Sequence, residues 1–125
     1  MGFSRARILI VEDEPNIAES LSFILRQAEF DVDAVSDGAE ALSRLRRQSF
    51  GAVVLDIMLP GMNGFDVLRA IRADAMLGAL PVIVLTAKGQ ANDRKTAETI
   101  GASAFITKPF SNAEIVERIS HFVGG

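Results

Sequence analysis

The sequence predicts an α/β protein with a doubly wound, five-stranded parallel sheet flanked by five helices. Five short apolar runs alternate strictly with five longer segments, the first and last of which clearly show the apolar spacing of a helix. The runs are almost continuously apolar and rich in β-branched residues, as in strands covered on both faces. With 125 residues, 49% of them hydrophobic, the chain can build one core. We therefore expect a single domain over residues 1–125, with no output domain.

The strands are expected at the five apolar runs, which cover residues 8–11, 32–35, 52–55, 82–85 and 104–106. The first helix begins near Pro15, since a residue without an N–H is tolerated in a first turn. Its apolar stripe consists of Ile17, Leu21, Ile24, Leu25 and Ala28. The last helix has a similar stripe of Ile115, Ile119, Phe122 and Val123. Gly101 is placed to end the fourth helix in a left-handed conformation.

Capping residues mark several helix starts. Asp37 is followed three residues later by Glu40, and Ser111 by Glu114, which is the spacing of a capping box. Asn63 is a suitable cap for the third helix. The three middle helices are accordingly expected over residues 39–48, 64–75 and 92–100.

Composition excludes several classes of function. The chain has no cysteine and one histidine, so disulfides, thiolate metal sites, cysteine nucleophiles and histidine-rich metal clusters are all ruled out. A formal net charge of −3 gives little electrostatic reason to bind nucleic acid directly. The sequence shows neither a secretory leader nor an apolar run long enough to span a bilayer. We expect a cytoplasmic protein that is not bound to membranes.

Polar side chains follow four of the five apolar runs. They are Glu12 and Asp13 after the first run, Asp56 after the third, Thr86 after the fourth and Lys108 after the fifth. In an open parallel sheet, the carboxyl ends of the strands lie at one edge, and this edge is where ligands bind. The sequence therefore predicts that these side chains form one site.

The residue types suit the transfer of a phosphoryl group. Crowded carboxylates repel one another and attract a cation, and a set of oxygen ligands favours Mg²⁺. Lys108 and Thr86 offer a charge and a hydroxyl to phosphate oxygens, and Asp56 offers a carboxylate nucleophile. Taken singly, Glu12 fits a loop residue or cap, Thr86 a strand-end hydroxyl, and Lys108 a solvated charge. Their joint placement favours the functional interpretation.

Two other functions are compatible with this fold class. A small phosphate-ester hydrolase could use Asp56 as its nucleophile, but Met58 stands where a second acid would be needed. A flavin-binding module would place an anionic cofactor against the first turn, where Glu12 and Asp13 repel it. Steady release of phosphate from small esters would favour the hydrolase, and a bound yellow chromophore the flavin protein.

Four segments together resemble the receiver domain of two-component response regulators, in the CheY-like superfamily. They are ILIVEDEP at 8–15, VLDIMLPGMNG at 54–64, LTA at 85–87 and KPF at 108–110. They occur in the family's order and extend over nearly the whole chain. The resemblance implies a flavodoxin-like fold with strand order 2-1-3-4-5.

The resemblance also implies a role for each site residue. Asp56 would accept a phosphoryl group from a histidine kinase or a histidine phosphotransfer protein. Mg²⁺ would be held by Glu12, Asp13, Asp56 and the backbone carbonyl of Met58, and Lys108 would pair with the phosphoryl group. Such a domain is a signalling module that catalyses only its own phosphorylation and dephosphorylation.

Further implied roles concern the change of conformation. Thr86 and Phe105 would be the switch residues, and the Lys108–Pro109 peptide would be cis. The surface formed by the fourth helix, fifth strand and fifth helix would then bind a downstream protein effector. Phe105 stands where a tyrosine is frequent, and a permanently buried core residue is the alternative interpretation of it. Met58 and Lys88 flank the site, and we expect them to influence the lifetime of the phosphorylated form.

The oligomeric state and the context of the domain stay open. Residues 101–104 lack the acidic pair that is common in regulators dimerising through the fourth helix, fifth strand and fifth helix. We therefore expect a monomer, and dimerisation on phosphorylation is left open. A stand-alone receiver and a receiver from a longer regulator or hybrid kinase both fit the sequence.

Overall fold

The computed structural model describes residues 6–59, 62–87 and 91–123, and it has the predicted architecture. The strands are β1 (Arg7–Val11), β2 (Asp31–Val35), β3 (Ala52–Asp56), β4 (Val82–Ala87) and β5 (Ala104–Lys108). The helices are α1 (Pro15–Gln27), α2 (Gly38–Arg47), α3 (Gly64–Ala73), α4 (Ala91–Ile100) and α5 (Asn112–Val123). All strand pairs are parallel in the order β2-β1-β3-β4-β5, which confirms the predicted topology.

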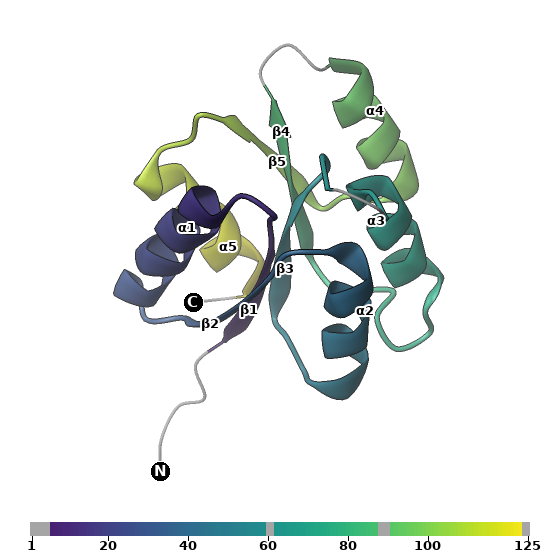
Figure 1. Cartoon of the computed structure of the whole chain (residues 1–125), viewed down its shortest axis with the longest axis horizontal. Coiled ribbons are helices and arrows are strands. Elements are labelled where there is room, and N and C mark those ends of the chain that lie inside the picture. Colours follow the sequence, from purple (N-terminus) through teal and green to yellow (C-terminus); the bar gives the residue numbers. More distant parts are fainter. Residues whose placement is uncertain (1–5, 60–61, 88–90, 124–125) are drawn as a thin grey trace.

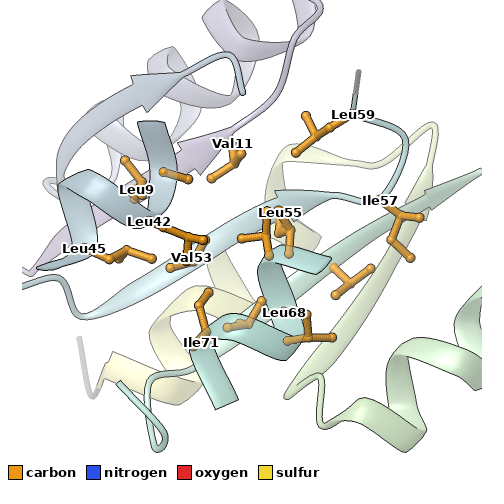
Figure 2. Packing of buried hydrophobic residues seen from close by; sticks show 14 of the residues in the cluster. Leu9, Val11, Leu42, Leu45, Val53, Leu55, Ile57, Leu59, Leu68 and Ile71 are labelled. Carbon is orange, nitrogen blue, oxygen red and sulfur yellow. The ribbon is translucent and has the colours of Figure 1, made fainter. Parts of the chain in front are cut away.

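The helices cover both faces of the sheet. Helices α1 and α5 pack on one face, and α2, α3 and α4 on the other (Figure 1). Because successive side chains of a strand point to opposite faces, each central strand contributes to two cores. In β1, Ile8 and Ile10 enter the core under α1 and α5, whereas Leu9 and Val11 enter the core under α2 and α3 (Figure 2). No helix within the described ranges is both long and apolar enough to span a membrane.

The predicted helix caps are present. The side chain of Asp37 accepts a hydrogen bond of 2.8 Å from the backbone N–H of Glu40, and Asn63 accepts one of 3.1 Å at the start of α3. Ser111 Oγ accepts a hydrogen bond of 3.1 Å from the N–H of Glu114. Each bond satisfies a backbone donor that has no partner within its own helix.

The end of α3 differs from its predicted position, and the end of α1 has an unusual backbone conformation. Helix α3 was expected to reach residue 75 but ends at Ala73, because Asp74 leaves the helix and caps the next turn. Asp74 Oδ1 accepts hydrogen bonds from the N–H groups of Met76 and Leu77, at 2.8 and 3.3 Å. After α1, Glu29 turns the chain towards β2 with a φ of 71°, a left-handed conformation that usually requires glycine.

Arg72 joins three segments at the amino edge of the sheet. Its guanidinium donates to the carbonyls of Gly101, Leu80 and Gly78 at 2.8, 2.7 and 3.2 Å, and to Ser103 Oγ at 3.2 Å. Gly101 ends α4 with a φ of 124°, so the predicted positive-φ glycine is present. Burial lowers the pKa of Arg72, but four acceptors stabilise its charge.

Candidate functional site

The carboxyl ends of β1, β3, β4 and β5 bring the predicted polar residues to one edge of the sheet. Asp56 pairs with Leu85 in the β3–β4 register, and Thr86 is the next residue of β4. Lys108, the last residue of β5, pairs with Ala87. Glu12 directly follows β1, where its N–H donates to the carbonyl of Val35 at 3.1 Å.

Three of these polar side chains are buried. Glu12, Asp56 and Thr86 are 3%, 3% and 4% exposed, whereas Asp13 is exposed. Burying a carboxylate is costly unless a cation or hydrogen-bond donors compensate for the lost water. The arrangement therefore implies specific partners for Glu12 and Asp56.

Lys108 provides the first compensating charge. Its Nζ lies 3.2 Å from Asp56 Oδ2 and 3.4 Å from Glu12 Oε1. Burial by itself would lower the pKa of Lys108, but the charges of Asp56 and Glu12 outweigh burial and raise it. Lys108 is therefore a firmly charged ammonium between two acids.

Glu12 is incompletely compensated. Its Oε2 accepts a hydrogen bond of 3.1 Å from the N–H of Glu14, but Oε1 is buried and has no hydrogen-bond partner among the described residues. Lys108 lies at ion-pair distance from Oε1 without the geometry of a hydrogen bond. Burial, and then the neighbouring Asp56, raises the pKa of Glu12 from 4.5 to about 7. A buried carboxylate oxygen without a hydrogen-bond partner is a suitable ligand for a further cation.

The loop after β3 is shaped around Asp56. The N–H of Met58 donates to Asp56 Oδ1 at 3.0 Å, and the N–H of Gly64 donates to the carbonyl of Ile57 at 3.0 Å. A Cβ on Gly64 would lie 2.5 Å from Ile57 Cα and 2.6 Å from the Asp56 carbonyl oxygen. Only glycine allows α3 to begin so close to the end of β3.

The acids suit a hard metal ion. Glu12, Asp13 and Asp56 each offer one carboxylate oxygen, and these oxygens all lie within 4.8 Å of one another. Glu12, whose Oε1 has no hydrogen-bond partner among the described residues, is one of these three acids. Oxygen-only ligands with a net negative charge are typical of Mg²⁺ sites.

The other residues predicted from the sequence have different environments. The Met58 side chain is 62% exposed, and the Lys108–Pro109 peptide is cis, the isomer that the resemblance implies. Phe105 is half-buried on β5 and packs against the core under α2, α3 and α4. Lys88 lies outside the described residues. One contact was not predicted from the sequence: Arg94 of α4 lies over the Phe105 ring, with its Cζ 4.9 Å from the ring centroid.

Comparison with known proteins identifies the family. The family model of the response regulator receiver domain matches residues 8–120. The DNA-binding response regulator MtrA of Mycolicibacterium smegmatis is 42% identical over 119 residues, which make up 95% of this chain and 51% of MtrA. The chain thus spans about half the length of the curated relatives it matches.

Two solved structures share the whole fold. A protein described as a response regulator from Chloroflexus aurantiacus J-10-fl has a TM-score of 0.94 and 30% identity, covering 98% of this chain and 100% of that one. The receiver domain of the sensor histidine kinase PA1611 from Pseudomonas aeruginosa PAO1 has a TM-score of 0.90 and 31% identity, with coverage of 98% and 100%. That receiver structure has a magnesium ion coordinated in its active site cleft.

The family match over most of the chain, the relatives and the acidic cluster at the carboxyl edge all agree. The chain belongs to the response regulator receiver domain family of two-component signalling proteins.

Proposed function

We propose that the domain is switched by phosphorylation of Asp56, with a phosphohistidine of a histidine kinase or a histidine phosphotransfer protein as donor. The observation that carries this proposal is the contact of Asp56 Oδ2 with Lys108 Nζ at 3.2 Å beside the buried, underbonded Glu12. These contacts support the proposal because they join a carboxylate, a fixed cation and one acid oxygen that has no hydrogen-bond partner among the described residues. Catalysis of phosphoryl transfer depends mainly on such positioning and charge neutralisation.

The reaction forms one bond and breaks one. A carboxylate oxygen of Asp56 attacks phosphorus, an O–P bond forms as the N–P bond of the donor breaks, and the donor imidazole, which already carries a proton on its other ring nitrogen, leaves as neutral imidazole. Lys108 stabilises the negative charge that gathers on the phosphoryl oxygens. The Met58 N–H, which donates to Asp56 Oδ1, fixes the carboxylate for attack. Thr86, buried at the end of β4, supplies a hydroxyl at the same edge.

Glu12, Asp13 and Asp56, together with the Met58 carbonyl, are the residues that we propose hold Mg²⁺. When bound, the ion neutralises negative charge on the carboxylates and on the transferred group. The clustering of the three acids within 4.8 Å supports this ligand set. The magnesium-bound receiver of PA1611 offers a parallel in a chain of 31% identity.

We propose that the phosphorylated domain is recognised by a downstream protein through the face of α4, β5 and α5, with Thr86 and Phe105 as switch residues. We also propose a cytoplasmic location and a monomeric unphosphorylated form. We expect residues 1–125 not to bind nucleic acid themselves. Since this chain spans 51% of the DNA-binding regulator MtrA, DNA recognition in a longer protein would belong to residues beyond these.

The direct test is intact-mass analysis after incubation with acetyl phosphate and Mg²⁺. We expect one adduct of about 80 Da, the mass of one phosphoryl group. The adduct should require Mg²⁺ and be absent from Asp56→Asn. Asp66→Asn, which removes an exposed acid on α3, is the matched control and should keep the adduct.

A small donor can react slowly for kinetic reasons, so a phosphohistidine donor protein is the second arm of the test. Failure of both donors at every Mg²⁺ concentration would overturn the proposal. An adduct that persists in Asp56→Asn would also overturn it, because it would place the acceptor elsewhere.

A further inference from the structure

A groove lies at the amino edge of the sheet, the edge opposite the acidic cluster. Because α2 runs back against the direction of the strands, its carboxyl end reaches this edge (Figure 1). The last turn of α2, the residues before β3 and the connection between α3 and β4 border a cavity of about 540 Å³. A cavity of this size is within the range of ligand sites in proteins.

The groove offers apolar surface to a ligand. The apolar residues that line it are Leu45, Phe50, Met76, Leu77, Leu80 and Pro81. Except for the buried Leu45, all of them are at least partly accessible to water. Single exposed apolar residues are common on a protein surface, whereas apolar residues gathered in one groove are typical of a binding site.

The turn that borders the groove after α3 is held in place by hydrogen bonds. Asp74 Oδ1 accepts from the N–H groups of Met76 and Leu77, at 2.8 and 3.3 Å. Arg72 donates from Nη1 to the Leu80 carbonyl at 2.7 Å. The groove is therefore preformed, and a ligand does not have to order this turn, which lowers the entropic cost of association.

The α2 side of the groove is positively charged. Arg46 and Arg47 both line the groove and are exposed. Asp74 is the one acid that lines it in the described part of the chain, and its Oδ2 already lies 3.7 Å from Arg46 Nε. Arg47 forms no ion pair with any described residue, and its Nε donates to the Ser43 carbonyl at 3.3 Å. The groove thus carries one positive charge that no acid in the described ranges compensates.

The dipole of α2 does not account for both arginines. Cations in a last turn stabilise a helix, but the carboxyl end of a helix carries only about half a unit of negative charge. The last turn of α2 holds Arg44, Arg46 and Arg47. Arg44 pairs with Asp33 of β2 at 3.5 Å, and the other two together exceed what the dipole requires. The excess is available to a negatively charged ligand.

An acidic peptide segment matches both the charge and the apolar surface. A carboxylate forms two parallel hydrogen bonds with a guanidinium, and apolar side chains of the same segment can cover the apolar residues of the groove. A nucleic acid would match only the charge, because its phosphates gain nothing from apolar surface. A small carboxylate would be poorly enclosed, because Met76 and the side chain of Arg46 are 92% and 58% exposed, whereas small-molecule sites enclose most of their ligand.

We infer that this groove is a docking site for an acidic peptide segment of a partner protein. A carboxylate of the segment pairs with Arg47, and an apolar side chain of the Leu, Met or Phe type packs against Phe50 and Leu77. Met76 has a flexible side chain and covers the bound apolar group from the rim of the groove. This docking site lies at the edge of the sheet away from Asp56 and does not depend on phosphorylation.

The first test is selection of a phage-displayed library of random short peptides on the full chain. We expect the wild type to enrich peptides that combine Asp or Glu with Leu, Met or Phe. Arg47→Glu reverses the charge of an exposed side chain and should not enrich them, whereas Arg69→Glu, the same change on α3, should enrich them as the wild type does. Absence of enrichment, or enrichment of the same peptides by Arg47→Glu, would overturn the proposal.

The contribution of each side chain is measured by fluorescence anisotropy of the most enriched peptide, labelled with fluorescein. Arg47→Glu should raise the Kd by about tenfold, and Arg69→Glu by less than about twofold. Met76→Glu should raise the Kd by about fivefold, because it places a negative charge at the rim of the groove. Phe23→Glu makes the same change at an exposed residue of α1 and should leave the Kd unchanged. Equal Kd values for Arg47→Glu and Arg69→Glu would contradict the docking site.

Two measurements distinguish the other possible occupants. A dimer of the wild type in sedimentation velocity that Arg47→Glu dissociates would assign the groove to a second copy of this chain and overturn the proposal. Phenylpropionate, an aromatic carboxylate, would assign it to a small molecule if it bound as tightly as the peptide. We expect a monomer and much weaker binding of phenylpropionate. None of these experiments uses a phosphodonor, so a failure to phosphorylate Asp56 would leave their outcome unchanged.

Discussion

The two edges of the sheet bury charged side chains in opposite ways. At the amino edge, the Arg72 guanidinium donates four hydrogen bonds to three carbonyls and one hydroxyl. At the carboxyl edge, Glu12 and Asp56 share one ammonium, and Glu12 Oε1 has no hydrogen-bond partner in the described part of the chain. A buried charge whose hydrogen bonds are all formed adds stability, whereas a buried charge that lacks partners can still bind a ligand. Burial of a charged side chain therefore does not by itself identify a ligand site, whereas a buried charge that lacks hydrogen-bond partners does.

The largest effect on stability is expected at the amino edge. Arg72→Met should lower the free energy of unfolding by about 2–3 kcal/mol, because the carbonyls and the Ser103 hydroxyl lose a charged donor. Urea denaturation measures this change. Arg69→Met is the matched control on α3, since Arg69 is exposed and forms a surface ion pair with Asp66. Equal stability of the two variants would show that the network contributes little.

An effect of similar size is a dependence of stability on pH that originates at the carboxyl edge. The pKa of Glu12 is about 7 in the folded protein and 4.5 as its ordinary value. Between these values the unfolded chain loses the proton and the folded protein keeps it, so stability falls as pH rises. The fall is on the order of 3 kcal/mol. The raised pKa of Lys108 has no effect in this range, because the ammonium is charged in both states.

Glu12→Gln isolates this contribution. Urea denaturation at pH 5 and pH 8 without Mg²⁺ should show that wild type loses more stability than the variant on going to pH 8. Other acids titrate in both proteins and cancel in the difference. A parallel pH profile for the two proteins would contradict the explanation given for Glu12.

A smaller effect is expected from Mg²⁺. A ligand that binds only the folded state at ten times its Kd stabilises by about 1.4 kcal/mol. We expect Mg²⁺ at this level to raise the Tm of wild type and to have little effect on Asp13→Asn. Asp66→Asn should respond as wild type does. The same rise in Tm for Asp13→Asn would exclude Asp13 from the metal site.

The smallest effect is expected from backbone strain at Glu29, near the amino edge of the sheet. Glu29 adopts a φ of 71°, so Glu29→Gly should stabilise the protein by about 1 kcal/mol. Glu29→Ala removes the same charge but keeps the Cβ, and should gain much less. Thermal unfolding compares the two variants, and an equal gain would assign the effect to the charge of Glu29. Neither change should alter phosphorylation.

The sequence predicted most of the fold and the residues of the carboxyl edge for physical reasons. Near-continuous apolar runs determine strands covered on both faces, and parallel strands bring Glu12, Asp56 and Lys108 to one edge. The network of Arg72 could not be predicted, because three of its four acceptors are backbone carbonyls, which every residue has. The end of α3 was misplaced because Ala75 suits a helix, whereas Asp74 caps the following turn.

The alternation of side chains in the strands divides the interior into two hydrophobic clusters separated by a single layer of backbone. Neighbouring residues such as Leu9 and Ile10 touch different clusters, and so do Val53 and Val54. Energetic coupling between substitutions decreases when the sites share no partners. Truncations on opposite sides of the sheet should therefore add in free energy, while truncations within one cluster should not. Substitutions can accordingly change the packing of one cluster while the other cluster still holds the strands, and with them the residues at the carboxyl edge, in position.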